Sequence, residues 1–384
     1  MSDYQRPIRV GMVGGGRDAF IGAVHRMAAS LDGSMCLVAG ALSSTPERSL
    51  ASARDLGLDE ERSYSSWEEM ITKEASRPAN DRIEAVVIVT PNHVHFAVAK
   101  AALEAGFHVI CDKPLVMNEA EADELVAIQA RTGLVFAVTY NYTGYPMIKQ
   151  ARHLVRNGAI GTVRKIIVEY NQGWLATPLE KTGQKQADWR TDPSRAGMGG
   201  AMGDIGSHAE NLVAYVTGLG ITEFSSDVTT HVEGRALDDD ASVLLRFENG
   251  ARGILTASQI CTGCQNDLRL RVWGTAGGLA WHQESPNRLV QNSIDGPEQI
   301  HHRADGSLCD ASLAGTRLPG GHPEAFIEAF ANIYRSAASA IRAGRDDGEA
   351  FDYPTVRDGA RGVKFISAVV SNSGTGWSLF QEGV

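Results

Sequence analysis

Three polar residues lie in short stretches whose residue types suit acid–base chemistry at a hydroxyl group. Lys113 lies in "CDKP" (111–114), and Asp204 and His208 lie in "GDIGSHAENL" (203–212). A histidine with a pKa near neutrality can accept a hydroxyl proton, and a lysine ammonium can stabilise negative charge developing on the oxygen. Asp204 and His208 are four residues apart, so on one helix they would share a face and could hold one substrate.

A glycine-rich turn, "VGGGRDAFIG" (13–22), follows an apolar run and precedes a helix-compatible stretch. Gly14 and Gly16 match the start of the Gly-x-Gly-x-x-Gly dinucleotide fingerprint, but the next glycine is Gly22 rather than residue 19. Such glycines let the backbone approach a pyrophosphate at a helix N-terminus. We interpret the turn as a lengthened fingerprint in which Gly22 takes the close-packed helix position, with Arg17 or Phe20 at the edge of the cofactor. The alternative is a strand–helix turn that binds no ligand.

The elements that must position this turn alternate between apolar strands and helices. The expected strands are 8–13, 36–42, 85–89, 108–111 and 134–139, and the expected helices are 20–31, 45–57, 95–106 and 119–133. This alternation predicts a doubly wound parallel sheet, whose ligands lie beyond the carboxyl ends of the strands.

The end of the second strand has no acidic residue for a ribose 2′-hydroxyl. Ser43 and Ser44 stand there, and Arg48 lies one turn further on. An acid at this position would favour NAD, whereas hydroxyls and an arginine can accept the 2′-phosphate of NADP. The residues therefore leave both cofactors open, and Arg48 can equally be a solvated helix residue.

The pattern changes at about Asn141, so we expect one domain over 1–140 and a second over 141–384. Strands are expected at 165–170, 241–247, 251–258 and 268–274, and helices near 146–157, 204–217, 323–343 and 355–370. A chain of 384 residues exceeds the usual size of a single core, which agrees with two domains.

The composition excludes several classes of partner. A net charge of −10 argues against nucleic acid, and no apolar run approaches the length of a membrane span. Five cysteines, an odd number, and no signal-like apolar stretch at the start predict a cytoplasmic protein with reduced thiols. No metal is expected, because "CTGC" (261–264) lacks companion ligands, and a turn explains "DDDA" (238–241).

The glycine turn (13–22), "TPNHVH" (90–95), "CDKP" (111–114) and "GDIGSHAENL" (203–212) resemble motifs of the Gfo/Idh/MocA family of oxidoreductases. They follow one another in the family's order along nearly the whole chain. The sequence departs from the family pattern at Asp112, where a glutamate is usual, and at Asn211, where an aspartate is usual. The resemblance implies an N-terminal Rossmann domain and an α+β C-terminal domain with an open, mostly antiparallel sheet. In this family the free face of that sheet often packs on another subunit, so a homodimer or homotetramer is expected.

The resemblance also assigns roles to individual residues. Lys113 and His208 would handle the reacting oxygen and its proton, and Asp204 would hold substrate hydroxyls. The expected cofactor-binding residues are Gly14, Gly16, Arg17, Phe20, Ser43, Ser44, Arg48, Thr90, Pro91, Asn92, His95, Asp112, Lys113 and Asn141.

A second group of residues is expected to contact the substrate. Flat aromatic faces beside amide and cationic donors suit a polyhydroxylated ring, although tryptophans more often fill cores and His322 can be an ordinary loop residue. The candidates are Tyr140, Tyr142, Trp174, Gln184, Lys185, Trp189, Arg190 and His322, together with Lys113, Asp204 and His208.

The long glycine loop (13–22), "CDKP" (111–114) and stretches that contain the substrate candidates are similar to those of a subgroup of levoglucosan dehydrogenase-like sugar dehydrogenases. This similarity implies NAD as the cofactor. The expected reaction is hydride transfer from a secondary hydroxyl, C3 by this similarity, of a pyranose-type sugar, an anhydrosugar such as levoglucosan, or a glycoside. The alternatives are an NAD-dependent glycosidase that oxidises C3 transiently, an inositol dehydrogenase, and a non-catalytic NAD-binding sensor.

Overall fold

The computed structural model describes residues 6–381, which form two compact units. Unit 1 comprises the residues up to Val116, Ala120–Asn141 and Phe326–Ala360. Unit 2 comprises Met117–Glu119, Tyr142–Ala325 and the residues from Arg361 onward. By its contacts, the segment Phe326–Ala360 therefore belongs with the N-terminal unit, although the sequence pattern grouped it with the second domain.

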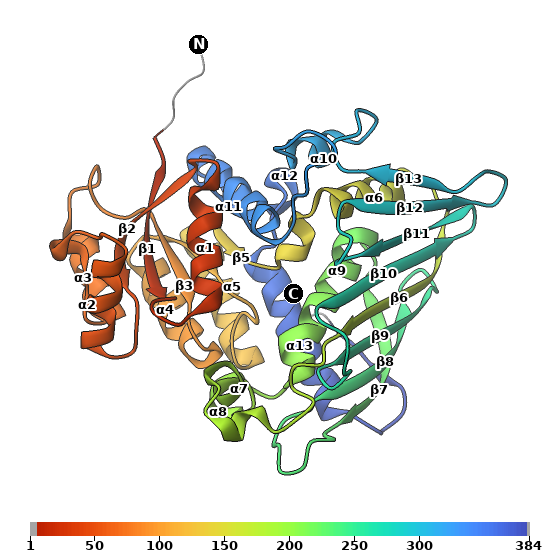
Figure 1. Ribbon diagram of the computed structural model, residues 1–384, viewed down its shortest axis with the longest axis horizontal. Coiled ribbons are helices and arrows are strands. Elements are labelled where there is room, and N and C mark those ends of the chain that lie inside the picture. Colours follow the sequence, from red (N-terminus) through yellow and green to blue (C-terminus); the bar gives the residue numbers. More distant parts are fainter. Residues whose placement is uncertain (1–5, 382–384) are drawn as a thin grey trace. The chain divides into compact units, whose positions relative to one another are not determined.

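Unit 1 is built on a five-stranded sheet in the order β2-β1-β3-β4-β5; Figure 1 labels β1, β2, β3 and β5. Every neighbouring pair is parallel. The strands are β1 (Ile8–Gly14), β2 (Met35–Ala41), β3 (Ala85–Val89), β4 (His108–Cys111) and β5 (Phe136–Val138). Most of their apolar residues are buried, as expected of a parallel sheet covered on both faces, and Leu37 and Val38 of the edge strand β2 are half-buried. The prediction of a doubly wound parallel sheet is confirmed.

The helices of this part of the chain are α1 (Phe20–Leu31), α2 (Pro46–Asp55), α3 (Trp67–Ser76), α4 (Asn92–Glu104) and α5 (Glu119–Thr132). The sequence pattern did not predict α3, although its start carries a recognisable signal. Ser66 accepts a hydrogen bond from the Glu69 amide, and Glu69 in turn accepts one from the amide of Ser65. This arrangement resembles the capping box, in which Ser and Glu three residues apart mark a helix start.

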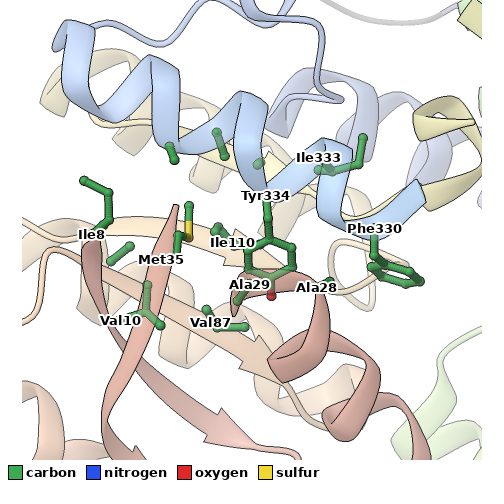
Figure 2. Close-up of a cluster of buried hydrophobic side chains, with 14 of the residues drawn as sticks. Ile8, Val10, Ala28, Ala29, Met35, Val87, Ile110, Phe330, Ile333 and Tyr334 are labelled. Atoms are coloured by element: carbon green, nitrogen blue, oxygen red, sulfur yellow. The ribbon is translucent and has the colours of Figure 1, made fainter. Parts of the chain in front are cut away.

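The hydrophobic core of unit 1 is completed by α11 (Phe326–Ala343), as Figure 2 shows. Phe330, Ile333 and Tyr334 are buried at helical spacing, against α1 and the sheet residues Val87 and Ile110. An apolar stripe of this kind must be covered by another element. Burial of this stripe against α1 and the sheet explains why a segment so late in the sequence belongs to unit 1.

Unit 2 contains a nine-stranded sheet in the order β13-β12-β11-β10-β6-β9-β8-β7-β14. Its strands are β6 (Val163–Asn171), β7 (Ile221–Thr229), β8 (Asp240–Phe247), β9 (Arg252–Ser258), β10 (Asp267–Gly274), β11 (Gly277–His282), β12 (Arg288–Ser293), β13 (Gln299–His302) and β14 (Ser378–Leu379). All pairs are antiparallel except β6 and β9, which run parallel. The predicted mostly antiparallel sheet is confirmed.

Helices cover one face of this sheet. The helix α9 (Ser207–Thr217) contacts β6, β9 and β10, and α6 (Pro146–Arg156) contacts β11 and β12. The remaining helices of unit 2 are α7 (Lys185–Arg190), α8 (Pro193–Ala196) and α10 (Asp310–Ala314). The helix α12 (Gly348–Phe351) belongs to unit 1, and α13 (Val356–Ser371) contains the boundary between the units. Along β6, buried side chains alternate with partly exposed ones, because successive side chains of a strand point to opposite faces of the sheet.

Candidate active site

The glycine turn of unit 1 closes against the ends of the neighbouring strands. Gly14 and Gly15 have φ angles of +79° and +71°, values that favour glycine. A Cβ atom at Gly14 would lie 2.3 Å from the Val89 carbonyl oxygen, and one at Gly16 would lie 2.5 Å from the Leu42 carbonyl oxygen. Glycines are therefore required in this turn by close backbone packing.

Gly22 is the glycine that lets α1 approach the turn. A Cβ atom at this position would lie 2.4 Å from the Cα atom of Gly15. This confirms the predicted close packing of Gly22, the position that the motif usually fills with a glycine at residue 19, whereas the contacts of the turn with a cofactor stay a prediction.

The extra residues of the loop are bound to α2. Arg17 pairs with Asp55 through two hydrogen bonds of 2.5 and 2.8 Å, and Arg48 pairs with Asp18 at 3.0 Å. Phe20, at the start of α1, is 69% exposed. The loop lines a pocket of about 480 Å³ with parts of α1 and α2. Arg17 and Arg48, predicted to line the cofactor, are thus also engaged with carboxylates of their own chain.

The loops after β3 and β4 are joined by a buried histidine. The two ring nitrogens of His95 lie 3.0 Å from the carbonyl oxygens of Thr90 and Pro114. Burial lowers the pKa of His95. Pro91 and Asn92 begin α4 between these contacts. His95 therefore holds two of the predicted cofactor-binding loops together through their backbones.

Asp112 positions the backbone of Lys113. Its Oδ1 atom accepts hydrogen bonds from the Lys113 amide at 2.9 Å and from the Thr139 hydroxyl at 3.1 Å. Its Oδ2 atom lies 4.0 Å from Nε2 of His25, a buried residue whose Nδ1 is 2.7 Å from the Tyr334 hydroxyl. The carboxylate that replaces the family's usual glutamate is therefore anchored in unit 1, beside the half-buried Lys113.

The residues of unit 1 fit a bound dinucleotide. Its glycine turn, Ser43 and Ser44, the loop containing Thr90, and Lys113 all follow the carboxyl ends of parallel strands, which is where such sheets bind ligands. The turn leaves no room for a Cβ atom and leads directly into the N-terminus of α1, a position that favours a pyrophosphate. Tyr140 and Asn141 are buried at the end of this segment of unit 1.

In unit 2, Asp204 lies in a π-helical turn, Met202–Gly206, that leads directly into α9. The sequence pattern predicted one continuous helix here, because π-turns have no simple periodicity signal and are often found at functional sites. The carboxylate of Asp238 accepts hydrogen bonds from the Gly200 and Met202 amides at 2.6 and 2.7 Å. The acidic stretch at 238–240 therefore includes a residue that holds the start of this turn.

Four of the residues predicted to contact substrate come together around Arg190. Its Nε atom lies 3.2 Å from Oδ2 of Asp204, and its guanidinium carbon lies 4.2 and 6.0 Å from the ring centroids of Trp189 and Trp174. Gln259 donates to the same Asp204 oxygen at 2.9 Å. We call Trp174, Trp189, Arg190, Asp204 and Gln259 the Asp204 cluster; it combines aromatic faces with amide and charged groups.

His208 lies beside a second group, the tyrosine cluster of Tyr142, Tyr170, His208 and Asn266. The rings of His208 and Tyr142 are 4.8 Å apart, and the hydroxyls of Tyr142 and Tyr170 are 2.5 Å apart. Tyr170 donates to Oδ1 of Asn266 at 2.6 Å. Burial raises the pKa of Tyr142 to about 12, so its phenol remains protonated at neutral pH.

A chain of hydrogen bonds connects the two clusters. Gln172 donates to Asn266 at 2.8 Å, accepts from the Trp174 indole at 2.9 Å, and lies 3.5 Å from the Gln259 amide nitrogen. Tyr170, Gln172, Gln259 and Asn266 were not among the residues predicted from the sequence. One usable signal was that Gln172 and Gln259 directly follow β6 and β9, whose ends lie side by side because these strands are parallel.

Three other candidates lie outside these two clusters. Gln184 caps α7 by accepting a 2.6 Å hydrogen bond from the Ala187 amide, and Lys185 is exposed. His322 is exposed in a loop, where its carbonyl oxygen accepts a hydrogen bond from Arg303. Their predicted contacts with substrate therefore have no support from the cluster geometry.

The described part of the chain contains neither a candidate membrane-spanning helix nor a candidate metal-binding group of side chains. Over residues 6–381, no helix has the length and apolar character to cross a bilayer. Within the same residues, no group of three or more His, Cys, Asp or Glu side chains could hold a metal ion.

Comparisons with known proteins agree with this geometry. Residues 8–140 match the model of an oxidoreductase family with an NAD-binding Rossmann fold, and residues 148–280 match the GFO/IDH/MocA C-terminal domain. A solved oxidoreductase from Sinorhizobium meliloti is 46% identical, with a TM-score of 0.89 over 98% of this chain and 100% of that one.

Two better described relatives are similar over much of their length. An inositol dehydrogenase homologue from Azotobacter vinelandii, solved with NAD+, is 36% identical, with a TM-score of 0.92 over 98% of both chains. The same homologue has also been solved with NADH and myo-inositol. Levoglucosan dehydrogenase from Pseudarthrobacter phenanthrenivorans is 30% identical over 73% of this chain and 75% of its own. This chain therefore belongs to the Gfo/Idh/MocA family and is an oxidoreductase with an NAD-binding Rossmann fold.

Proposed function

We propose that the protein is a dehydrogenase that oxidises a secondary ring hydroxyl, at C3, of a pyranose-type sugar, an anhydrosugar such as levoglucosan, or a glycoside. The observation that carries this proposal is the Asp204 cluster, where the guanidinium of an arginine paired with Asp204 lies within 6.0 Å of two indole rings. Aromatic faces can pack on the apolar side of a sugar ring, while the charged and amide groups bind its hydroxyls. Similarity to levoglucosan dehydrogenase supports the same substrate class.

The proposed roles of the residues follow their chemistry. The nicotinamide of NAD, when bound, accepts a hydride. Lys113 donates a hydrogen bond to the reacting oxygen and stabilises its negative charge. His208 accepts the hydroxyl proton, and its position is supported by packing against Tyr142. Asp204 holds substrate hydroxyls, aligned by Arg190 and Gln259.

A cyclitol is the second candidate substrate. The inositol dehydrogenase homologue from Azotobacter vinelandii shares more of its sequence with this chain than levoglucosan dehydrogenase does. An inositol presents a ring of secondary hydroxyls without a ring oxygen, and the same hydrogen-bonding groups suit it. The two classes are therefore to be compared directly in the assay.

We also propose that the sheet of unit 2 forms a contact between copies of this chain, as a homodimer or homotetramer. On strands of this sheet, Leu244 and Trp273 are 48% and 38% exposed, and Ile300 is 40% exposed. Exposed apolar side chains of this size on three strands of one sheet favour burial in an interface. Size-exclusion chromatography with light scattering tests this, and a monomer at micromolar concentration would contradict it.

A reducing compartment such as the cytoplasm is proposed for the protein. All five cysteines are free thiols in the structure. Burial raises the pKa of the Cys111 thiol well above its usual value, which keeps it protonated and unreactive. Detection of the protein in a cytosolic fraction would support this placement, and an extracellular location would contradict it.

The experiment that tests the function is a substrate panel of anhydrosugars, pyranosides and inositols with NAD and with NADP, followed at the absorbance band of the reduced cofactor. Net accumulation of NADH with a sugar supports the proposal. Release of an aglycone at constant NADH would instead identify an NAD-dependent glycosidase.

Two variants test the residue roles once a substrate is found. We expect Lys113→Ala and His208→Asn each to lower kcat by about 10²–10⁴-fold, the usual effect of losing an acid–base or charge-stabilising group. The matched controls are His153→Asn, at an exposed position of α6, and Lys100→Ala, whose side chain on α4 is 38% exposed and pairs with Glu124. A kcat within a few-fold of wild type for Lys113→Ala or His208→Asn would remove that residue from the mechanism.

A further inference from the structure

The loop that lengthens the glycine turn contains an aspartate, Asp18, whereas the end of the second strand has no acidic residue. Residues 42–45, which follow β2, include Ser43 and Ser44 and no acid, whereas Asp18 of the loop pairs with Arg48 of the next helix. Its Oδ2 atom is 3.0 Å from Arg48 at the start of α2, and its side chain is 75% exposed. The carboxylate is therefore accessible to a ligand at the carboxyl end of β2, where a Rossmann fold binds the adenosine ribose.

The position of Asp18 is set by several contacts on each side of it. The Gly16 amide donates to the Leu42 carbonyl oxygen at 3.0 Å, which ties the loop to the end of β2. The Arg17 amide donates to the Ser52 hydroxyl at 3.1 Å, and Arg48 also donates to the Arg17 carbonyl oxygen at 3.2 Å. Asp18 has a φ of +63°, a left-handed conformation that aspartate and asparagine tolerate better than most residues.

The charges at this edge are matched in pairs. Arg17 is held by Asp55 and Arg48 by Asp18, so two cations face two carboxylates. A 2′-phosphate brings about two negative charges at neutral pH. To bind near Arg48 it would have to compete with Asp18 for the guanidinium and lie close to the like charge of that carboxylate. A 2′-hydroxyl meets no such opposition, and a carboxylate can accept its hydrogen bond.

We infer that Asp18 is the residue that makes this protein select NAD over NADP. In other Rossmann folds an acid at the end of the second strand binds the ribose 2′-hydroxyl. Here Asp18, in the inserted loop, has this role. The inference depends on the NAD-binding Rossmann fold and on no assignment of the sugar. It makes Arg48 a latent phosphate-binding residue that Asp18 keeps occupied.

The test is the variant Asp18→Asn, which removes the charge and keeps a residue that tolerates the left-handed conformation. Dissociation constants of NADH and NADPH are measured from the fluorescence of the reduced nicotinamide, with no substrate present. We expect the ratio of the NADPH to the NADH dissociation constant to fall by about tenfold or more, equivalent to about 1.4 kcal/mol. Thermal unfolding verifies that the variant is folded.

Two further variants test whether the effect is specific to the Asp18 carboxylate and whether it depends on Arg48. Asp55→Asn releases Arg17 in the same loop, and we expect the ratio to stay within about twofold of wild type, because this pair lies toward the other end of α2. In Asp18→Asn combined with Arg48→Leu, the gain for NADPH should disappear, because the gain requires a freed guanidinium.

Either of two results would overturn the inference. One is an unchanged ratio in Asp18→Asn while NADH still binds. The other is a gain for NADPH that persists when Arg48 is also replaced. Failure of the wild-type protein to bind NADH would be a different outcome, because it would contradict the proposed dehydrogenase function as well.

Discussion

Each unit contains an arginine–carboxylate pair held by further polar groups, but the two pairs differ in how completely they are enclosed. In unit 1, Arg62 pairs with Glu74; in unit 2, Arg190 pairs with Asp204. The side chains of the first pair are 10% and 0% exposed, and those of the second are 23% and 18% exposed. We take this difference to distinguish a pair that holds the fold from a pair that can meet a ligand.

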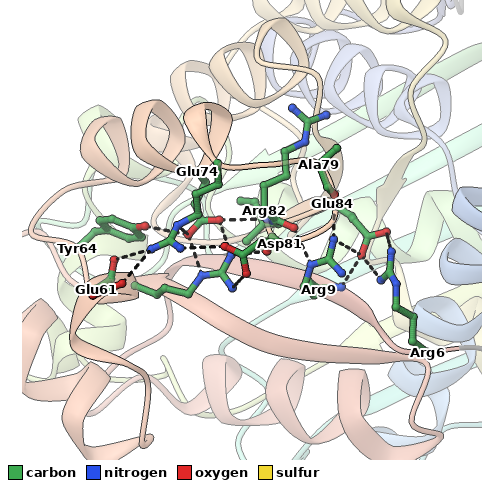
Figure 3. A network of polar contacts seen from close by, with 12 residues as sticks. Arg6, Arg9, Glu61, Tyr64, Glu74, Ala79, Asp81, Arg82 and Glu84 are labelled. Atoms are coloured by element: carbon green, nitrogen blue, oxygen red, sulfur yellow. Dashed lines mark hydrogen bonds and ion pairs between the residues drawn. The ribbon is translucent and has the colours of Figure 1, made fainter.

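Glu74, the carboxylate of the enclosed pair, has its hydrogen bonds supplied from within unit 1; Figure 3 shows it beside Tyr64. Glu74 accepts two hydrogen bonds from Arg62, at 3.0 and 2.7 Å, one from the Tyr64 hydroxyl at 2.8 Å and one from the Ile83 amide at 3.0 Å. A buried carboxylate must be satisfied in this way, because desolvation of an unpaired charge costs several kcal/mol. The pair therefore joins α3 to the segment before it and to the start of β3.

The partly exposed pair is less constrained. Arg190 contacts Asp204 at 3.2 Å from a short helix, and its guanidinium is stacked near two indole rings. Its partner stands in a π-helical turn whose start is held by Asp238. Groups that remain accessible in this way can exchange partners with the hydroxyls of a ligand.

The largest expected effect comes from opening the enclosed pair. Replacement of Arg62 by Leu removes two hydrogen bonds from a cation to the buried Glu74 and leaves Arg77, 3.4 Å away, as its remaining cation, so we expect the free energy of unfolding to fall by about 3 kcal/mol. Chemical denaturation measures this loss. Arg6→Leu is the matched control, because Arg6 pairs with Glu84 while 56% exposed, and its loss should cost less than about 1 kcal/mol. Equal losses in the two variants would contradict the distinction by enclosure.

A smaller effect, on activity rather than stability, is expected from the partly exposed pair. Arg190→Leu should lower kcat/KM for the substrate by about 10–100-fold, or about 1.4–2.7 kcal/mol, chiefly through KM, because it removes a group that aligns Asp204. The unfolding free energy should change by less than about 1 kcal/mol. Arg195→Leu, which removes an exposed pair with Asp188, is the control. Unchanged kinetics in Arg190→Leu would show that this pair is also structural.

The smallest expected effect is a pH dependence specific to the enclosed pair. Burial alone would raise the pKa of Glu74, but hydrogen bonds from Arg62, Tyr64 and the Ile83 amide hold it below its usual value of 4.5. A carboxyl whose pKa is lower in the folded state stabilises the protein fully above its unfolded pKa and loses this contribution as the pH falls through its folded pKa.

The comparison that isolates this dependence is wild type against Glu74→Gln. Between about pH 5 and pH 3, the unfolding free energy of wild type should fall more steeply than that of the variant, since the amide does not titrate. Denaturant titrations across this range provide the measurement. Parallel curves would indicate that Glu74 has the same pKa in the folded and unfolded states.

Much of the fold was predictable because its strands are short apolar runs bounded by turn residues. β3 and β4 have the predicted bounds, and α1 spans the predicted residues 20–31. The prediction was weakest where partners come from distant sequence. Nothing local shows that α11 packs on α1 and the sheet of unit 1, and the outer strands β11–β13 were not expected.

The site was predictable in residue type and less so in arrangement. Trp174, Trp189, Arg190 and Asp204 were singled out as candidates, and the structure gathers them into one cluster. Gln259 and Asn266 were missed, because an amide after or before a strand carries no distinctive signal until the pairing of strands is known. The catalytic and binding roles of all these residues remain predictions.

By itself, the sequence determined the family, the parallel sheet and the lengthened glycine turn, because these depend on local apolar runs and on glycines at defined spacing. Only the tertiary structure decided what the inserted residues of that turn contact. Asp18 and Arg48 are 30 residues apart along the chain, and they meet because the turn after β1 and the start of α2 converge at one end of the sheet. Ion pairs between distant residues depend on this convergence, which no local pattern encodes.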